Sequence, residues 1–291
     1  MNNQSTTDHE DLHVRPLEPR DLRDALQNLA ILIAAAVFLT GCAAPASMPA
    51  PTNAAPFGQS VTLIYAPGIG GYGHNDREWI SGLRAGGYSG STEVRNWSGK
   101  LMPISALWAH ALHRAEARRM ADRISQLHSE SPTKPIVLVG HSAGAGLVIR
   151  ALEDLPPDVQ VDDLVLLAPA LSRTYDLTRA LRHVRGRADV FYSERDTLVL
   201  ALGTSLFGTV DGVQAEAAGH AGFIKPPGAS AAAYAKLFQH PYSDDRHQHG
   251  DNGGHEGALA PAVAWGLIDP LLPGHELHAQ AIAQTDTHEL P

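Results

Sequence analysis

The segment Gly140-His141-Ser142-Ala143-Gly144 contains the residues best suited to chemistry. A serine with a glycine two positions away on each side is typical of a nucleophile elbow. The chain turns so sharply there that side chains at the two glycine positions would not fit. The apolar run of residues 136–140 leads into the motif, and a helix of small residues is expected over 143–154. This turn would project Ser142 above a sheet, with the free amides at the helix start beside it. The motif therefore predicts a nucleophilic serine.

The elements that must position this serine follow from the apolar pattern. Runs expected to form strands are residues 61–66, 92–97, 136–140, 164–170, 188–193 and 212–218. Helical patterns lie between them, at residues 104–128, 143–154, 174–185, 197–206, 230–239 and 258–272. Continuous apolar strands that alternate with helices are typical of a mostly parallel sheet covered by helices on both faces. We therefore expect an α/β fold in a single domain.

A strand, a G-x-S-x-G turn and a helix in this order resemble the α/β-hydrolase superfamily, and the resemblance covers nearly all of residues 61–272. It implies that Ser142 is the nucleophile and that two backbone amides form an oxyanion hole. One amide would come from Ala143. The other would come from the loop Pro67-Gly68-Ile69-Gly70-Gly71, where Ile69 is the expected donor. The His-Gly-Gly-Gly sequence of some esterases is absent, and a glycine-rich turn without this role is the alternative for the loop.

The resemblance also implies an acid after the strand at residues 188–193. Asp196 follows that strand at its carboxyl end, where functional groups gather in open α/β sheets. A carboxylate there would hold the catalytic histidine in the required tautomer and stabilise its charged form. Glu194, in the same turn, is the alternative acid.

Two histidines follow the acid in the chain and could serve as the base. His220 comes after the possible strand at residues 212–218, an arrangement that is common in the superfamily. His255 lies between glycines and leads into the expected helix at residues 258–272. The superfamily pattern places its histidine on a loop before the last helix, which favours His255 over His220. We expect His141, inside the elbow, to be a packing neighbour rather than the base.

Histidines and carboxylates gather near His255, and these side chains can bind zinc or copper. The group comprises His240, His247, His249 and His255 with Asp244, Asp245 and Asp251. The run at residues 244–252 resembles a polar surface loop, however, and shows no ligand spacing on a helix. We expect no metal and no cofactor.

The composition limits the class of partner. The 291 residues are 44% hydrophobic and 18% charged, which is ordinary for a globular protein. The formal net charge is −9 and no basic run occurs, so nucleic-acid binding is not expected. No apolar run reaches the roughly 18 residues of a membrane-spanning helix.

The single cysteine, Cys42, stands three positions after the end of an apolar run at residues 29–39. The ending Leu39-Thr40-Gly41-Cys42 resembles the lipobox of bacterial lipoproteins, in which the cysteine is acylated and becomes the new N-terminus. This resemblance implies a signal peptide within residues 1–41 and attachment to a membrane through lipid on Cys42. A short hydrophobic helix with an incidental cysteine is the alternative.

The rest of the N-terminal region suits a tether. Residues 42–58 are rich in alanine and proline and carry no charge, a composition that stays extended. The folded domain is then expected over residues 59–291. Ala43 follows the cysteine where an aspartate would favour inner-membrane retention. The resemblance therefore implies the bacterial cell envelope, at the outer membrane facing the periplasm in a Gram-negative cell.

These features together predict a membrane-tethered serine hydrolase that acts on carboxylic esters, either small molecules or lipids. Ser142, His255 and Asp196 would form its triad and an acyl-enzyme its intermediate. The choice of esters rests on analogy, because the same fold hosts thioesterases, amidases, acyltransferases and peptidases. A catalytically idle binding or envelope-scaffold lipoprotein is the alternative from another class.

Overall fold

The computed structural model describes residues 48–98, 106–196 and 216–275. Cys42, the whole leader at residues 1–41 with its apolar run, and the expected helix at residues 197–206 lie outside these residues. No helix within the described part of the chain is long and apolar enough to cross a membrane.

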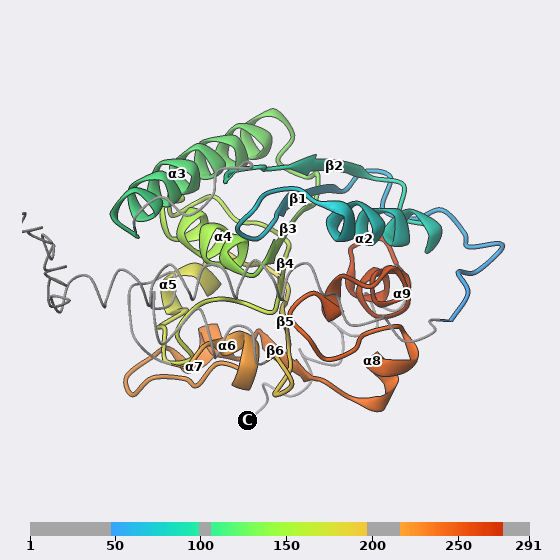
Figure 1. Ribbon diagram of the computed structural model, residues 1–291. Helices are drawn as coiled ribbons and strands as arrows, with labels where there is room; N and C mark the ends of the chain where they lie inside the picture. The colour runs from blue at the N-terminus through green and yellow to red at the C-terminus, as the bar shows by residue number, and fades with distance from the viewer. Residues whose placement is uncertain (1–47, 99–105, 197–215, 276–291) are drawn as a thin grey trace, which may run out of the picture. The chain divides into compact units, whose positions relative to one another are not determined.

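The described residues form one sheet of six parallel strands, in the order β2-β1-β3-β4-β5-β6 (Figure 1). The strands are β1 (Thr62–Ala66), β2 (Ser91–Val94), β3 (Ile136–His141), β4 (Asp163–Leu167), β5 (Ala188–Tyr192) and β6 (Leu237–Pro241). β1, β3 and β4 are buried throughout, which explains their continuous apolar sequences. The mostly parallel sheet expected from the sequence is confirmed.

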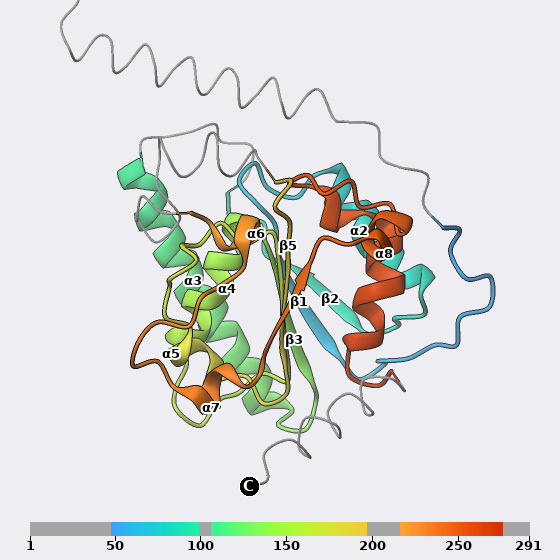
Figure 2. The same ribbon diagram turned by 90° about the horizontal axis from the view of Figure 1, so that it is seen from below.

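Helices cover both faces of the sheet, as Figure 2 shows. One face carries α3 (Ala106–Glu130), α4 (Ala143–Glu153), α5 (Thr178–Leu181), α6 (Ala218–Ala221) and α7 (Ala231–Tyr234). The other carries α2 (His74–Ala85), α8 (Asp244–Gln248), α9 (Pro261–Val263) and the helical turns η2 (Gly257–Leu259), η3 (Ala264–Ile268) and η4 (Asp269–Leu271).

The strands supply side chains to two cores because successive residues point to opposite faces. On β1, Ile64 packs in the core under α3 and α4, whereas Leu63 and Tyr65 pack in the core under α2 and the C-terminal turns. Met120 of α3 and Trp79 of α2 are fully buried at the centres of these two layers. Burial of both faces fixes the register of the strands, because a slip by one residue would move the side chains of each core to the opposite face.

The helix expected at residues 258–272 is divided into η2, α9, η3 and η4. Three other expected elements also differ in the structure. Residues 230–239 do not form one helix, since α7 ends at Tyr234 and β6 then pairs with β5. β6 completes the backbone hydrogen bonds along that edge of β5, a requirement that outweighs the local helical pattern. The helix expected at 174–185 is reduced to Thr178–Leu181, and Val184 then pairs with Val161.

The third difference concerns the strand expected at residues 212–218. Its described part, from residue 216, contains no strand: Ala217 forms an isolated bridge to Ser172 and Ala218 begins α6. The short alanine-rich segment packs its helical turn against the end of β5 instead.

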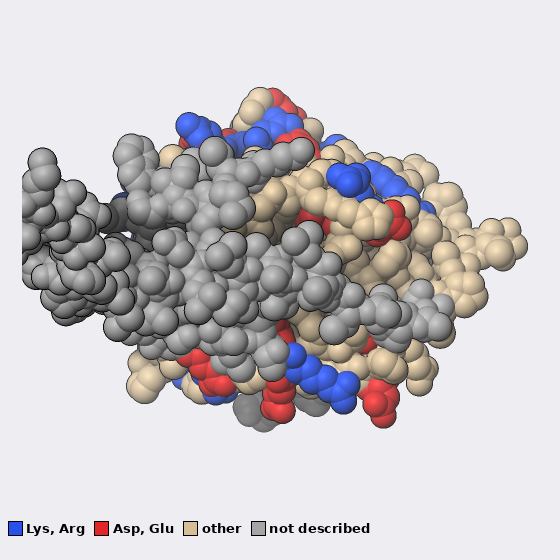
Figure 3. All heavy atoms as spheres, viewed as in Figure 1, with Lys and Arg blue, Asp and Glu red and all other residues tan. Residues whose placement is uncertain are grey.

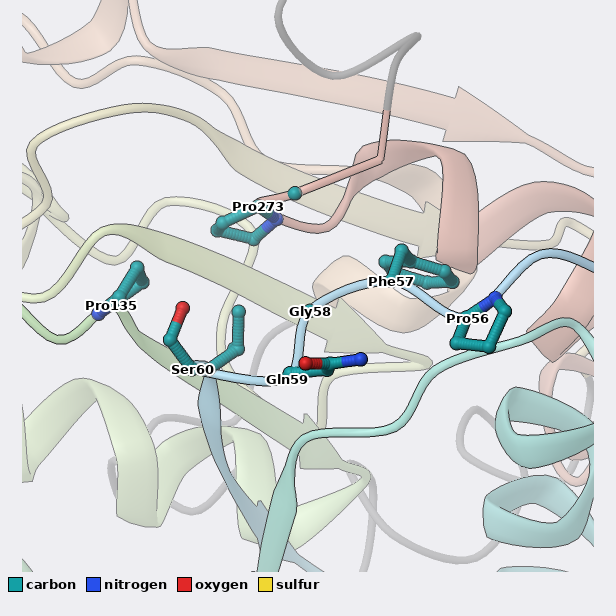
Figure 4. A pocket seen from close by; sticks show the side chains of 9 residues that line it. Pro56, Phe57, Gly58, Gln59, Ser60, Pro135 and Pro273 are labelled. Atoms are coloured by element: carbon teal, nitrogen blue, oxygen red, sulfur yellow. The ribbon is translucent and has the colours of Figure 1, made fainter.

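A cavity of about 360 Å³ lies at the amino ends of the strands (Figure 4). Its lining residues are Pro56, Phe57, Gly58, Gln59, Ser60, Val61, Pro135, Pro273 and Gly274. Val61 and Pro135 directly precede β1 and β3, so this cavity opens at the end of the sheet opposite Ser142.

Charged side chains of both signs appear around the edges of the face shown in Figure 3, with uncharged residues between them. Among the described residues on that face, no broad patch of one sign stands out.

The carboxyl group of Asp269 in η4 is buried, at 1% exposed. Within the described part of the chain, neither of its oxygens has a hydrogen-bond partner. The end of α2 packs directly on it, since a Cβ at Gly86 would lie 1.9 Å from its Oδ2. Burial raises the pKa of Asp269 to about 9, against a smaller opposing effect of Arg84. Its carboxyl group is therefore neutral at pH 7.

Candidate active site

Ser142 occupies a strained turn between β3 and α4. Its φ of 55° and ψ of −123° are rare for a residue other than glycine, and such strain is concentrated at functional sites. The flanking glycines make the turn possible. A Cβ at Gly140 would lie 2.6 Å from the Cα of Ala145, and one at Gly144 would lie 2.2 Å from the carbonyl oxygen of Ala66. The absence of both side chains lets the helix start pack directly against the strands.

Ser142, His255 and Asp196 come together at the carboxyl edge of the sheet. The Oγ of Ser142 lies 2.8 Å from Nε2 of His255, and Nδ1 of His255 lies 2.7 Å from Oδ2 of Asp196. Because a carboxylate only accepts hydrogen bonds, Nδ1 carries the proton and Nε2 is left to accept from the serine hydroxyl. Asp196 is 1% exposed and His255 9%, so water competes little for these bonds.

The charge of Asp196 governs the protonation of His255. Burial lowers the pKa of the imidazole, but the charge and hydrogen bond of Asp196 outweigh it, with a smaller contribution from Glu256. The net effect raises the pKa of His255 above its usual value. This imidazole is well suited to take a proton and hold the resulting positive charge.

His141 supports the loop that carries His255. Its Nε2 donates to the carbonyl oxygen of His255 over 3.2 Å, and the two ring centroids are 5.1 Å apart. Burial lowers the pKa of His141, which keeps its ring neutral. These contacts are those of a packing neighbour, the role expected from the sequence.

The two expected oxyanion donors lie on either side of the serine. Ala143 is the first residue of α4, so its amide has no acceptor within the helix. The loop with Ile69 lies against the nucleophile, because a Cβ at Gly68 would be 3.2 Å from the Cβ of Ser142 and 3.6 Å from its Oγ. The amide of Ile69 makes no backbone hydrogen bond among the described residues. Both amides are available for a substrate oxygen.

The alternative residues from the sequence take other places. His220 lies in α6, with its Nε2 3.7 Å from Oε1 of Glu216, and it has no hydrogen bond to Ser142. Glu194 is exposed to solvent, whereas Asp196 in the same turn is buried. The structure brings His255 and Asp196, rather than the two alternatives, to Ser142.

A family model described as serine aminopeptidase, S33, matches residues 116–199, which is less than a third of the chain. The match includes Ser142 and Asp196 but ends before His255. No curated protein matches this sequence significantly.

Several solved structures are similar to this chain. Lipase B of Aspergillus fumigatus is 15% identical, with a TM-score of 0.46 over 85% of this chain and 60% of the lipase. An acetylxylan esterase is 17% identical, with a TM-score of 0.39 over 74% and 98% of the two chains. A cutinase of Trichoderma reesei is 14% identical, with a TM-score of 0.35 over 87% and 93%. This chain thus spans about 60% of the lipase, and none of these similarities identifies a substrate.

The strand order and the strained serine turn decide the fold. The chain has an α/β-hydrolase fold.

In this fold, an ion pair that the sequence did not indicate joins the two loops of the site. Oδ2 of Asp251 accepts from Nε of Arg246 at 2.8 Å and forms an ion pair with its Nη2 at 2.6 Å, and Oδ1 accepts from the amide of Gly253 at 2.7 Å. Arg246 also donates to the carbonyl oxygens of Tyr192 and His240. Arg246 therefore connects the end of β5, before Asp196, to the loop that leads to His255.

The expectation of a polar surface loop at residues 244–252 therefore holds only in part, because about half of the segment is exposed but other residues are buried. Arg246 is 4% exposed and Asp251 fully buried, and α8 begins this segment. The sequence shows only an arginine and an aspartate five positions apart, a pattern that fits a solvated pair equally well. Within the described residues, no group of His, Cys, Asp or Glu side chains is arranged to hold a metal ion.

Proposed function

We propose that this protein is a serine hydrolase that cleaves carboxylic esters through an acyl-enzyme intermediate. The observation that carries the proposal is the continuous hydrogen-bond chain from Ser142 through His255 to Asp196, with heavy-atom distances of 2.8 and 2.7 Å. Nucleophile, base and orienting acid within hydrogen-bond reach of one another form the arrangement that activates a serine.

In the first half of the proposed reaction, Oγ of Ser142 attacks the ester carbonyl carbon while Nε2 of His255 takes the hydroxyl proton. The carbonyl oxygen becomes negative, and the amides of Ala143 and Ile69 donate to it. His255 then gives its proton to the leaving alcohol, and the C–O bond breaks to leave an acyl group on Ser142. Asp196 stabilises the imidazolium without itself taking the proton.

In the second half, water attacks the acyl carbon and His255 takes a proton from it. Collapse of the second tetrahedral intermediate returns that proton to Ser142 Oγ and releases a carboxylic acid. The strained backbone of Ser142 keeps Oγ directed at His255 throughout. No cofactor takes part in either half.

The first test is labelling with a fluorophosphonate probe, which reacts only with an activated serine. The wild type should be labelled and should hydrolyse short p-nitrophenyl esters, whereas Ser142→Ala should do neither. Equal labelling of both proteins would instead favour the alternative, a catalytically idle binding or scaffold protein. A wild type that is neither labelled nor active would favour it too. Circular dichroism of the variant checks that its fold is intact.

The matched family model is named for an aminopeptidase, which makes amide cleavage the second candidate. An aminoacyl p-nitroanilide and a thioester, tested beside the p-nitrophenyl esters, separate these activities. We expect a higher kcat/KM for the ester than for the anilide, since alcohols leave more readily than amines.

We also propose that lipid on Cys42 attaches the protein to a membrane of the bacterial cell envelope, with a small-molecule or lipid ester as substrate. The support for this location is the apolar run that ends in Leu39-Thr40-Gly41-Cys42, followed by the uncharged tether.

A further inference from the structure

The loop at residues 67–73 has few contacts of its own to fix its shape. Gly70 and Gly71 have φ values of 102° and 79°, and the side chain of Ile69 is 68% exposed, so core packing does not hold the middle of the loop. A donor to an oxyanion must keep its position closely, because a shift of about 1 Å can forfeit most of its effect. Within the loop, the amide of Gly71 donates to the carbonyl oxygen of Gly68 (3.3 Å), and further bonds come from residues outside the loop.

Three consecutive residues after β2 make hydrogen bonds to this loop. The amide of Tyr72 donates to Oδ1 of Asn96 (3.0 Å), Nε1 of Trp97 donates to the oxygen of Pro67 (2.8 Å), and Oγ of Ser98 donates to the oxygen of Gly68 (3.3 Å). We call residues 96–98 the brace. It contacts the loop at both ends and next to its proposed donor.

The bond from Ser98 acts on the peptide group that contains the proposed donor. The carbonyl of Gly68 and the N–H of Ile69 belong to one planar trans peptide, so they point in opposite directions. A donor on the carbonyl oxygen therefore fixes the direction of the N–H and also polarises it. Ser98 is 9% exposed, which limits competition from water.

The peptide that carries the Ala143 amide is held in the same way. Its carbonyl oxygen, that of Ser142, accepts from the amides of Ala145 and Ala170, each at 3.1 Å. Both proposed oxyanion donors thus belong to peptides whose carbonyl oxygens are hydrogen-bonded on the opposite side. At the Ile69 peptide, the carbonyl oxygen of Gly68 accepts from the amide of Gly71 and from the hydroxyl of Ser98, each at 3.3 Å, and a substitution can remove the second of these bonds.

Trp97 connects the loop to the elbow. Its ring meets the imidazole of His113 edge-on, with centroids 5.1 Å apart, and Nε2 of His113 lies 3.1 Å from the oxygen of Ala143. Nη1 of Arg150 lies 3.2 Å from Nδ1 of His113. An arginine can only donate, so Nδ1 accepts and Nε2 carries the proton that is donated to Ala143. His113 is 2% exposed and so forms a fixed link between brace and elbow.

We infer that Trp97 and Ser98 are positioning residues for the oxyanion hole, an inference that rests on the proposed function. Neither touches the reacting atoms, and both act through the loop at residues 67–73. Their effect belongs to the transition state, where the negative oxygen exists, and not to the bound ester. Loss of either bond should therefore lower kcat and leave KM nearly unchanged.

The test compares Ser98→Ala, Ser98→Thr and Trp97→Phe with the wild type. Ser98→Ala should lower kcat for a short p-nitrophenyl ester about tenfold, less than the roughly 10²–10³-fold for losing a donor outright. A trifluoromethyl ketone, which forms an oxyanion on the serine, should bind the variant more weakly by a similar factor. Ser98→Thr keeps a hydroxyl and should restore most of both losses. Trp97→Phe keeps an aromatic ring and should lower kcat in the same direction.

Ser89→Ala is the matched control. The hydroxyl of Ser89 also donates to a backbone oxygen, that of Phe57 at 2.7 Å, but at the amino ends of the strands. Its loss should lower stability without changing kcat or binding of the ketone. If Ser98→Ala fails to fold, Trp97→Phe decides the matter with the same measurements.

The outcomes separate this inference from the proposed function. Full activity of Ser142→Ala would overturn the proposed function and the inference with it. An inactive Ser142→Ala beside Ser98→Ala and Trp97→Phe of wild-type kcat and ketone affinity would overturn the inference alone. Equal losses in Ser98→Ala and the Ser89→Ala control would also overturn it, since both would then reflect general destabilisation.

Discussion

Replacement of Asp196 by asparagine removes a carboxylate that lies 2.7 Å from Nδ1 of His255 while keeping nearly the same shape. The carboxylate fixes the proton on Nδ1 and stabilises the imidazolium that forms when Ser142 loses its proton. An asparagine amide can donate to Nδ1 and so select the wrong tautomer. In a serine triad this substitution lowers kcat by roughly 10⁴-fold. At about 1.4 kcal/mol for each factor of ten, the barrier should rise by about 5 kcal/mol.

The same variant should change the pH dependence in a defined direction. His255 must be neutral to act as a base, so kcat/KM rises as the pH passes its pKa. In the wild type that pKa lies above the usual value, because Asp196 outweighs the opposing effect of burial. Without the carboxylate, burial lowers the pKa of His255 with less opposition. The acidic limb of the profile should therefore move to lower pH in Asp196→Asn.

Steady-state hydrolysis of a short p-nitrophenyl ester between pH 5 and 9 measures both effects. Glu194→Gln is the matched control, because it removes a carboxylate from the same turn that is exposed to solvent. Its kcat and its acidic limb should equal those of the wild type. If Asp196→Asn kept kcat within tenfold and its limb unmoved, the assignment of Asp196 as the orienting acid would be refuted.

The remaining predictions concern the base, the buried carboxyl and the anchor. His255→Ala should lower kcat by roughly 10⁴-fold or more while His220→Ala keeps most of the activity, and the reverse result would move the base to His220. Asp269 keeps its proton in the folded chain up to about pH 9 but loses it near pH 4 when unfolded, so stability should fall as the pH rises between these values. Asp269→Asn should remove this decline, and urea unfolding at pH 8 should show it to be at least about 1 kcal/mol more stable than the wild type. An equal pH dependence of stability in both proteins would contradict this. Metabolic labelling with a palmitate analogue in a bacterial host should mark the wild type but not Cys42→Ser, and equal labelling of both would refute the anchor.

The sequence alone determined the elements whose signals are local. The apolar runs that became β1, β3 and β5 lie within one residue of their predicted limits, and β4 ends three residues early, at Leu167. Strands buried on both faces are recognisable because their sequences are mostly apolar. The turn at Ser142 was predictable for a similar reason, since its two glycines and the flanking strand and helix are adjacent in the chain. Asp196 followed from its place just after a recognisable strand.

Tertiary structure decided everything that depends on which segments meet. Residues 237–241 became a strand only because the edge of β5 needed a partner, a need that the sequence of that segment does not show. The choice between His255 and His220 depended on which loop returns over the carboxyl edge of the sheet. The buried pair of Arg246 and Asp251 helps to hold that loop, and its two charges are adjacent only after β5 and α8 have packed together.

The contacts of the brace, residues 96–98, also depend on which segments meet. Ser98 and Gly68 are far apart in the chain, and a serine beside a tryptophan after a weak strand is unremarkable in sequence. Their contact exists because β1 and β2 pair in parallel, so that the segments leaving both strands emerge at one edge of the sheet. Sequence spacing thus identified the candidate nucleophile and its local turn, whereas the pairing of the strands selected the side chains that surround it.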